Sequence, residues 1–254
     1  MALMGEQEHI DHRLCTTVSG LGRDLKPVLD RIPGTGCRGV QLPAGEPGTR
    51  PRDLDGLARR GLSRELSRRQ LELRGFDLWI PMEHFASAGT VDRATGVVIE
   101  TIQLCHQMGN VPLSLRLPVQ DPQSPSPQVD QVNQTILAAS EAHGVMLVDF
   151  SDHERPEGVK VGLDPAALLA DGVEPSAAIE QAGPDLGSVR LVDLMDTGMR
   201  GPVGFGADNR LDLMAFKVAL DVNGFLGSLV IDTRQWEDPW AGLHLSIQSW
   251  ASIQ

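Results

Sequence analysis

Short apolar runs alternate with amphipathic segments along most of the chain. Several of the apolar runs are bounded by glycine, proline or aspartate, as buried strands are. The segments between them place apolar residues three and four positions apart, which is typical of helices with one buried face. The pattern predicts strands at 14–18, 39–42, 76–80, 111–117, 145–150, 159–164, 189–193 and 228–232, and helical segments at 24–32, 61–74, 90–109, 129–143, 164–182, 211–222 and 240–253.

This order of elements predicts a single α/β domain over residues 1–254. Strands that alternate with helices form parallel sheets, and eight such units close into a (β/α)8 barrel, the TIM barrel, of about 250 residues. One unit departs from the pattern, because too few residues separate 145–150 from 159–164 to form a full helix. The sequence therefore predicts a TIM barrel in which the helix between strands five and six is missing or very short.

Two segments match catalytic motifs without the context that these motifs need. Gly34–Gly39 fits the pattern GxGxxG, but a dinucleotide site requires that run after a strand and at the start of a helix. Here the run follows a helix and precedes a strand. Residues 151–153 are Ser-Asp-His, but neighbours in one loop cannot form the two hydrogen bonds of a catalytic triad. Neither segment predicts a site.

The charge of the chain narrows the class of partner. A formal net charge of −12 argues against nucleic acid, which proteins bind through cationic side chains. Residues 50–74 are an exception, because arginines outnumber acidic residues there. Both a solvated helix face and a contact surface for an anionic partner fit this composition.

Signals for secretion, membrane insertion and disulfide formation are weak. Residues 1–12 contain no apolar core of a signal peptide, and no apolar stretch is long enough to cross a membrane. The three cysteines have no framework spacing, so we expect buried thiols at Cys15, Cys37 and Cys105. These features predict a cytoplasmic protein with no membrane partner, and they leave the oligomeric state open.

Each of the last four predicted strands ends in aspartate after a nearly apolar run. The four residues are Asp149, Asp164, Asp193 and Asp232. Active sites of TIM barrels lie where the strands reach their carboxyl ends, so we expect the four carboxylates to face one mouth. Each aspartate could instead cap the loop or helix that follows it, a role in which aspartate is common.

Motifs in the second half of the chain point to a family. The chain has Asp-Pro-Ala-Ala at 164–167, Asp-Leu-Met-Asp at 193–196, a loop with Pro-Val-Gly-Phe-Gly at 202–206, and a run from Gly227 to Asp232. This order resembles the xylose-isomerase-like barrels of the sugar isomerase and epimerase family. Their strands six, seven and eight end in Asp-Pro-x-His, His-x-Lys-Asp and Gly-x-hydrophobic-Glu, and a Pro-hydrophobic-Gly-x-Gly loop precedes their seventh helix. The resemblance covers about half of the chain.

The resemblance implies a divalent metal site at the barrel mouth. The family holds its metal with a Glu, an Asp, a His and a second Glu, and the two Glu also transfer protons beside a metal-polarised carbonyl. The matching positions here are Asp149, Asp164, Asp193 and Asp232, so Asp149 and Asp232 take the catalytic places. An all-oxygen ligand set favours Mg²⁺, Mn²⁺ or Ca²⁺. A slip of one residue on strand five would instead place Phe150 at the first position.

Both the metal positions and the substrate-binding positions depart from the family pattern. Aspartate is one methylene shorter than glutamate, and a displacement of about 1 Å can cost roughly 100-fold in rate. The family's substrate-binding His and Lys correspond to Ala167 and Met195. Candidates for contact with a sugar are His84 after strand three, and Arg234 and Trp236 after strand eight.

Three functions follow from this interpretation, and the sequence leaves them open. One is a metal-dependent sugar isomerase or epimerase. In this first reading the metal site at the mouth is altered, and whether it is active or holds a metal at all stays open. Another function is a non-catalytic binding module for a sugar, a polyol or a cation on the same fold. The last is a scaffold whose arginine-rich second helix is a contact surface.

Overall fold

Eight parallel strands close into one barrel, as the hydrophobic pattern predicts. The computed structural model of the chain describes residues 11–120, 126–204 and 206–253. The order around the barrel is β1-β10-β7-β6-β5-β4-β3-β2, and each neighbouring pair is parallel. The barrel strands are β1 Leu14–Thr17, β2 Gly39–Pro43, β3 Glu72–Leu78, β4 Leu113–Leu115, β5 Leu147–Asp149, β6 Lys160–Leu163, β7 Leu186–Leu191 and β10 Ser228–Ile231. The predicted TIM barrel is confirmed.

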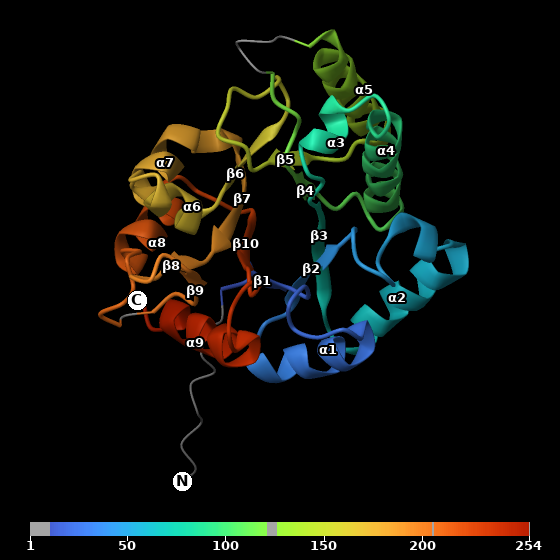
Figure 1. Ribbon diagram of the computed structural model, residues 1–254. Helices are drawn as coiled ribbons and strands as arrows, with labels where there is room; N and C mark the ends of the chain where they lie inside the picture. Colours follow the sequence, from blue (N-terminus) through green and yellow to red (C-terminus); the bar gives the residue numbers. More distant parts are fainter. Residues whose placement is uncertain (1–10, 121–125, 205, 254) are drawn as a thin grey trace.

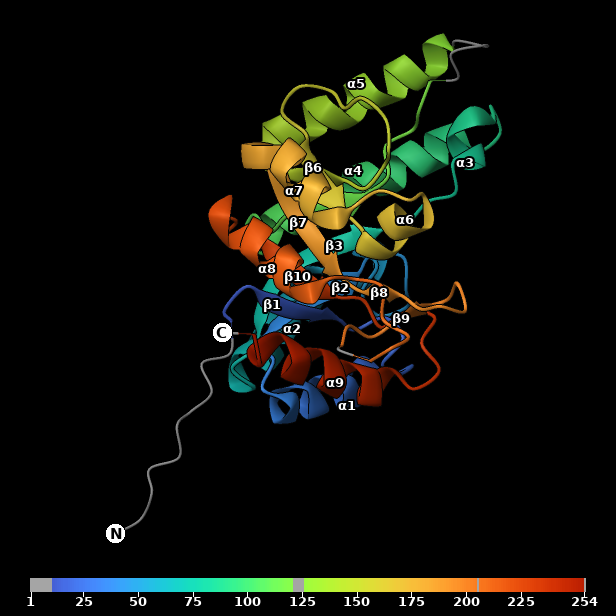
Figure 2. The ribbon, with the colours of Figure 1, turned by 90° about the vertical axis from the view of Figure 1, so that its left-hand side faces the viewer.

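Helices surround the barrel on the outside (Figure 1). A side view shows the short helices α3 and α6 on the side of the molecule away from the C-terminal end of α9 (Figure 2). A small antiparallel hairpin of β8 Asp193–Leu194 and β9 Arg200–Gly201 follows β7. The helices are α1 Leu25–Arg31, α2 Gly56–Arg68, α3 Glu83–Ala86, α4 Val91–Gln107, α5 Pro127–His143, α6 Pro165–Ala170, α7 Pro175–Ala182, α8 Leu213–Val222 and α9 Pro239–Ala251.

The boundary between α2 and β3 differs from the sequence prediction. The helix was expected to end at Gly75, but α2 ends at Arg68 and β3 begins at Glu72. Gly75 lies inside the strand, where a Cβ atom would come within 2.9 Å of the Pro112 carbonyl oxygen. Glycine at this position therefore allows two backbones to approach closely, and it does not end a helix.

No helix separates β5 from β6, in agreement with the sequence. Residues 150–158 contain only bends and turns, so Phe150 follows β5 directly. The Phe150 ring lies over Gly162 of β6, where a Cβ atom would come within 2.4 Å of the ring. Glycine at 162 therefore creates the space that this ring fills.

Replacing Gly162 with alanine is expected to lower the free energy of unfolding by about 1–3 kcal/mol, because the Phe150 ring would have to move within a packed wall. Chemical denaturation measures this change. Gly96→Ala in α4 is the matched control, since a Cβ atom there meets nothing within 4 Å. The control variant should be unchanged or more stable, because alanine favours helix over glycine. Equal stability of both variants would contradict the packing argument.

The cysteines and the helices agree with the remaining expectations. Cys15, Cys37 and Cys105 are free and buried, and burial raises the pKa of the Cys37 thiol to about 11. No helix in the described part of the chain is both long and apolar enough to cross a membrane. The expectation about a signal peptide concerns mainly residues 1–10, which lie outside the described ranges.

The inside of the barrel is partly polar. Gln41 on β2, Asp77 on β3, Ser114 on β4 and Arg190 on β7 are all at most 2% exposed. Gln41 Nε2 donates to Ser114 Oγ over 3.2 Å, and Arg190 Nη1 donates to Gln41 Oε1 over 2.7 Å. Buried polar groups of this kind are stable only when they are hydrogen-bonded, so the interior is organised around them.

Candidate functional site

A cavity of about 490 Å³ opens at the carboxyl ends of the barrel strands. In TIM barrels this end carries the active site. Its walls come from loops after β3, β4, β5, β6 and β10, together with β7 and β9. The lining residues are Trp79, Ile80, Pro81, Met82, Arg116, Phe150, Asp164, Arg190, Arg200, Asp232, Arg234 and Gln235.

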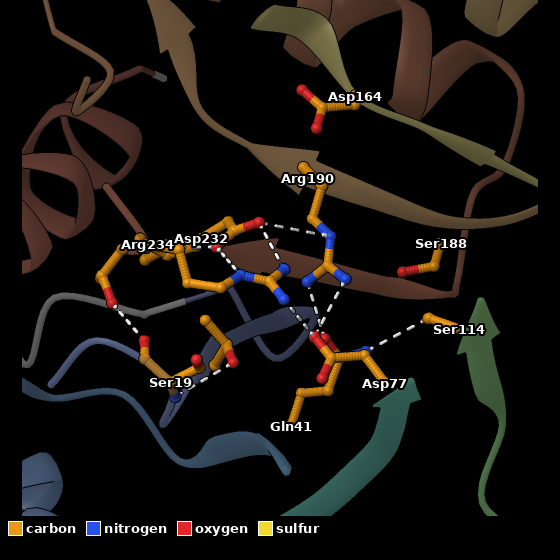
Figure 3. Close-up of polar contacts among 12 residues, drawn as sticks. Ser19, Gln41, Asp77, Ser114, Asp164, Ser188, Arg190, Asp232 and Arg234 are labelled. Carbon is orange, nitrogen blue, oxygen red and sulfur yellow. Dashed lines mark hydrogen bonds and ion pairs between the residues drawn. The ribbon is translucent and has the colours of Figure 1, made fainter. Parts of the chain in front are cut away.

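Arg190 is a buried cation of the pocket lining, and Figure 3 shows it among its polar neighbours. Its side chain is 1% exposed and extends from β7 between Asp77 and Asp232. Nη2 lies 3.4 Å from Asp77 Oδ2, and Nε lies 3.8 Å from Asp232 Oδ2. The guanidinium therefore joins carboxylates from opposite parts of the barrel, β3 and the end of β10.

Arg234 contacts the same two carboxylates. Its Nε and Nη2 atoms donate to the two oxygens of Asp232 over 2.7 and 2.6 Å, which is a bidentate pair. Its Nη1 atom lies 3.1 Å from Asp77 Oδ2. Together with Arg190, it surrounds each carboxylate with two guanidiniums.

Arg200 extends this network toward the rim. Nη1 donates to Asp164 Oδ2 over 2.7 Å, and Nη2 donates to Asp232 Oδ2 over 3.3 Å. Asp164 also accepts a hydrogen bond from Ala167 N at the start of α6 over 3.3 Å, so it caps that helix. Arg200 and Asp164 are 22% and 19% exposed and Arg234 is 22% exposed, whereas Arg190, Asp77 and Asp232 are at most 4% exposed.

The arginines determine how the buried carboxyls ionise. Burial disfavours the charged form of Asp232, but Arg190 and Arg234 outweigh burial and hold its pKa well below the usual range. Burial raises the pKa of Asp77, against the attraction of Arg234 and Arg190. Burial lowers the pKa of Arg234, but hydrogen bonding to Asp232 outweighs this and raises it. Asp232 and Arg234 are therefore permanently charged at neutral pH.

The side chains of Asp149 and Asp193 are directed away from the pocket, which differs from the expectation that all four strand-end aspartates share it. Asp149 Oδ1 accepts hydrogen bonds from the backbone amides of Leu117 and Ser151. Asp193 accepts three backbone amides in the following loops and the side-chain amide of Asn209. Both are 0% exposed and organise loops. Phe150, next to Asp149 on the opposite side of the strand, lines the pocket instead.

Only one of the three residues predicted to contact a sugar lines the pocket. Arg234 lines the pocket. His84 lies on α3, outside the set of lining residues. Trp236 is 8% exposed and packs against Gly242 of α9, where a Cβ atom would come within 2.5 Å of the indole. The structure thus brings Asp164, Asp232 and Arg234 together, and places the other predicted residues elsewhere.

The donor set does not fit a divalent metal. Among the described residues, no three His, Cys, Asp or Glu side chains are arranged to hold an ion. The carboxylates that do reach the pocket, Asp164 and Asp232, already bind arginines. A metal ion would have to displace these guanidiniums from the two carboxylates or bind beside them. In the second case the positive charges of the metal and the guanidiniums would repel each other.

Sequence reasoning missed Arg190, Asp77, Trp79 and Arg200. Arg190 and Asp77 interrupt strands that were treated as apolar, and a charged residue within a barrel strand is a signal for a buried polar interior. Trp79 forms an edge-to-face pair with Phe150 at 5.6 Å between ring centroids. Arg200 lies in the β8–β9 hairpin, which no pattern in the local sequence predicts.

Comparisons with known proteins identify the fold. No family model and no curated protein matches the sequence. Among solved structures, a D-psicose 3-epimerase superposes with a TM-score of 0.69 at 13% identity, over 94% of this chain and 97% of the epimerase. A xylose isomerase domain protein from Planctomyces limnophilus gives 0.68 at 16% identity, over 94% and 93%. An L-ribulose 3-epimerase gives 0.67 at 15% identity, over 92% and 91%. The chain thus has the xylose-isomerase-like TIM-barrel fold.

Proposed function

We propose that the protein is a binding module that holds a small polyhydroxylated molecule, a sugar or a polyol, in the mouth pocket without a metal. The observation that carries this proposal is that Asp164 and Asp232, the carboxylates of the pocket, are paired with arginines. A cavity of about 490 Å³ has the size of a small-molecule site. Two structures of the same fold are named as epimerases of the sugars D-psicose and L-ribulose, which supports the class of ligand.

Proton transfer has little support in this pocket. The alternative function, a sugar isomerase or epimerase, needs Asp149 and Asp232 as proton carriers. Asp149 faces loop amides, and a carboxylate with the low pKa of Asp232 is a weak base. Among the described residues, the lining also contains no histidine, lysine or glutamate that could serve as an alternative proton carrier.

Purified protein is expected to contain no stoichiometric Mg²⁺, Mn²⁺, Ca²⁺ or Zn²⁺ by elemental analysis. It should catalyse no exchange of the proton beside the carbonyl of D-fructose or D-psicose in D₂O, with or without added Mn²⁺, as followed by NMR. Exchange that depends on Mn²⁺ and disappears in Asp232→Asn would contradict the proposal and favour the enzyme.

Binding itself is tested by calorimetry with D-fructose, D-psicose, sorbitol, D-gluconate and D-fructose 6-phosphate. At least one of these should bind the wild-type chain. Ile80→Trp is expected to abolish that binding, because the larger side chain fills the cavity. Leu245→Trp, at an exposed position on α9, is the matched control and should bind normally. Absence of binding to every compound, or equal binding by both variants, would overturn the proposal.

A further inference from the structure

The mouth pocket has two chemically different walls. Trp79 and Phe150 form an aromatic wall, continued by Ile80, Pro81 and Met82. Guanidinium groups form another part of the lining, and two of these lie over the rings. Arg190 is 5.0 Å from the Phe150 centroid, and Arg234 is 5.4 Å from that of Trp79. A ligand in this cavity therefore meets both apolar surface and cations.

Positive charge exceeds negative charge in the pocket. Four lining residues are arginines and two are aspartates, so the lining has two more cationic than anionic groups, and the buried Asp77 beneath them offsets at most one of these. The chain as a whole carries −12. The excess cation is Arg116, which is exposed at the rim and can therefore bind an anion that enters the pocket without first giving up a carboxylate of the described residues.

The arginines differ in how far their donors are already used. Arg190 and Arg234 are held on several sides by Asp77, Asp232 and Gln41. Arg200 is as exposed as Arg234, at 22%, but it bonds to the described residues only through its two Nη atoms, whereas Arg234 uses all three of its nitrogens. Arg116 is exposed, and none of the described residues forms an ion pair with it. Since a guanidinium has five N–H donors, Arg116 and Arg200 retain donors for a ligand at the rim.

We propose that the ligand of the mouth pocket is an anion, a sugar acid or a sugar phosphate. Arg116 and Arg200 bind its carboxylate or phosphate, and its carbon skeleton lies against Trp79 and Phe150. This inference rests on the proposed function, and it adds the charge class of the ligand. Arginine suits this task because its planar fork matches both carboxylate and phosphate oxygens.

Matched pairs of probes test the charge class. Calorimetry compares sorbitol with D-gluconate, and D-fructose with D-fructose 6-phosphate, and it includes inorganic phosphate alone. The anionic member of at least one pair is expected to bind about tenfold or more tightly, since hydrogen bonds between charged groups are about twice as strong as neutral ones. Its affinity should fall as salt rises from 20 to ~300 mM, because added ions screen a partly exposed charge. A preference within the sorbitol and D-gluconate pair indicates a carboxylate ligand, and a preference within the D-fructose and D-fructose 6-phosphate pair indicates a phosphate ligand.

Two variants locate the contact. Arg116→Gln and Arg200→Gln should each remove most of the preference for the anionic probe, measured as the ratio of its affinity to that of its neutral partner. Arg64→Gln is the control, because Arg64 lies on the exposed face of α2 outside the pocket. Retention of the full preference in both variants would overturn the assignment to these arginines.

The failures of the two proposals are distinguishable. Neutral probes that bind as tightly as anionic ones, in a manner that Ile80→Trp abolishes, would refute the anionic ligand and leave the binding module intact. No binding by any probe would refute the binding module itself. Binding of inorganic phosphate alone, with no gain from a sugar, would refute the skeleton contact with the aromatic wall.

Discussion

Replacing Arg190 with methionine is expected to lower the free energy of unfolding by about 3–5 kcal/mol, the cost of removing one partner from a buried ion pair. The change leaves Asp77 and Asp232 with one guanidinium fewer in the barrel interior, where both are almost fully buried. It also leaves Gln41 Oε1 without its donor. A loss of this size is a large part of the stability of an ordinary domain. Urea denaturation at pH 7 measures it.

Two further variants serve as controls: one removes an exposed arginine, and the other removes a carboxylate that Arg190 contacts. Arg116→Met removes an exposed arginine of the same pocket and should change stability by less than about 0.5 kcal/mol. Adding Asp77→Asn to Arg190→Met should restore part of the loss, because it removes one uncompensated carboxylate. A double variant that is less stable than Arg190→Met would contradict the ion-pair explanation.

The effect of Arg190 should also depend on pH. Its guanidinium helps to hold the pKa of Asp232 below the usual range, so this stabilisation is present above the unfolded-state pKa of about 3.9. It is lost as pH falls through that value toward the pKa in the folded state. The stability difference between wild type and Arg190→Met is therefore expected to shrink below about pH 4. A difference that stays constant down to pH 3 would contradict the electrostatic origin.

Replacing Asp193 with alanine is expected to destabilise the fold by on the order of 3 kcal/mol, because buried donors lose their acceptor. Asp193 Oδ1 accepts from the amides of Leu194 and Leu211 over 2.7 and 2.9 Å, and Oδ2 accepts from Asn209 over 2.8 Å. Asp193→Asn retains one acceptor oxygen and should cost clearly less. Thermal and chemical denaturation measure both.

Asp196→Ala is the matched control, since Asp196 is an exposed aspartate of the same hairpin and should be neutral to replace. The experiment also separates two roles of Asp193. A variant Asp193→Ala that stays fully stable but loses bound Mn²⁺ would identify the residue as a metal ligand, as the family resemblance implies. A stability loss with no change in metal content would support its place in the loop.

The site could be predicted only in part. Asp164, Asp232 and Arg234 follow strands and reach the mouth as expected. On strand five the sequence left Asp149 and Phe150 open, because neighbouring strand residues face opposite sides and no local pattern says which one faces the mouth, and in the structure Phe150 lines the pocket. A strand-end aspartate also has two stable uses, facing a pocket or binding loop amides, and the loops decide between them.

The sequence by itself determined the number and order of the barrel strands and the short connection between β5 and β6. These features depend on hydrophobic period and on the length of connections, which consecutive residues encode. It also placed the site at one end of the barrel, since parallel strands bring their carboxyl ends together. Only the tertiary structure decided that the carboxylates are neutralised by arginine. Arg190 and Asp77 are 113 positions apart, and they pair because closure of the barrel places β3 and β7 across its interior from each other, for which the local sequence carries no signal.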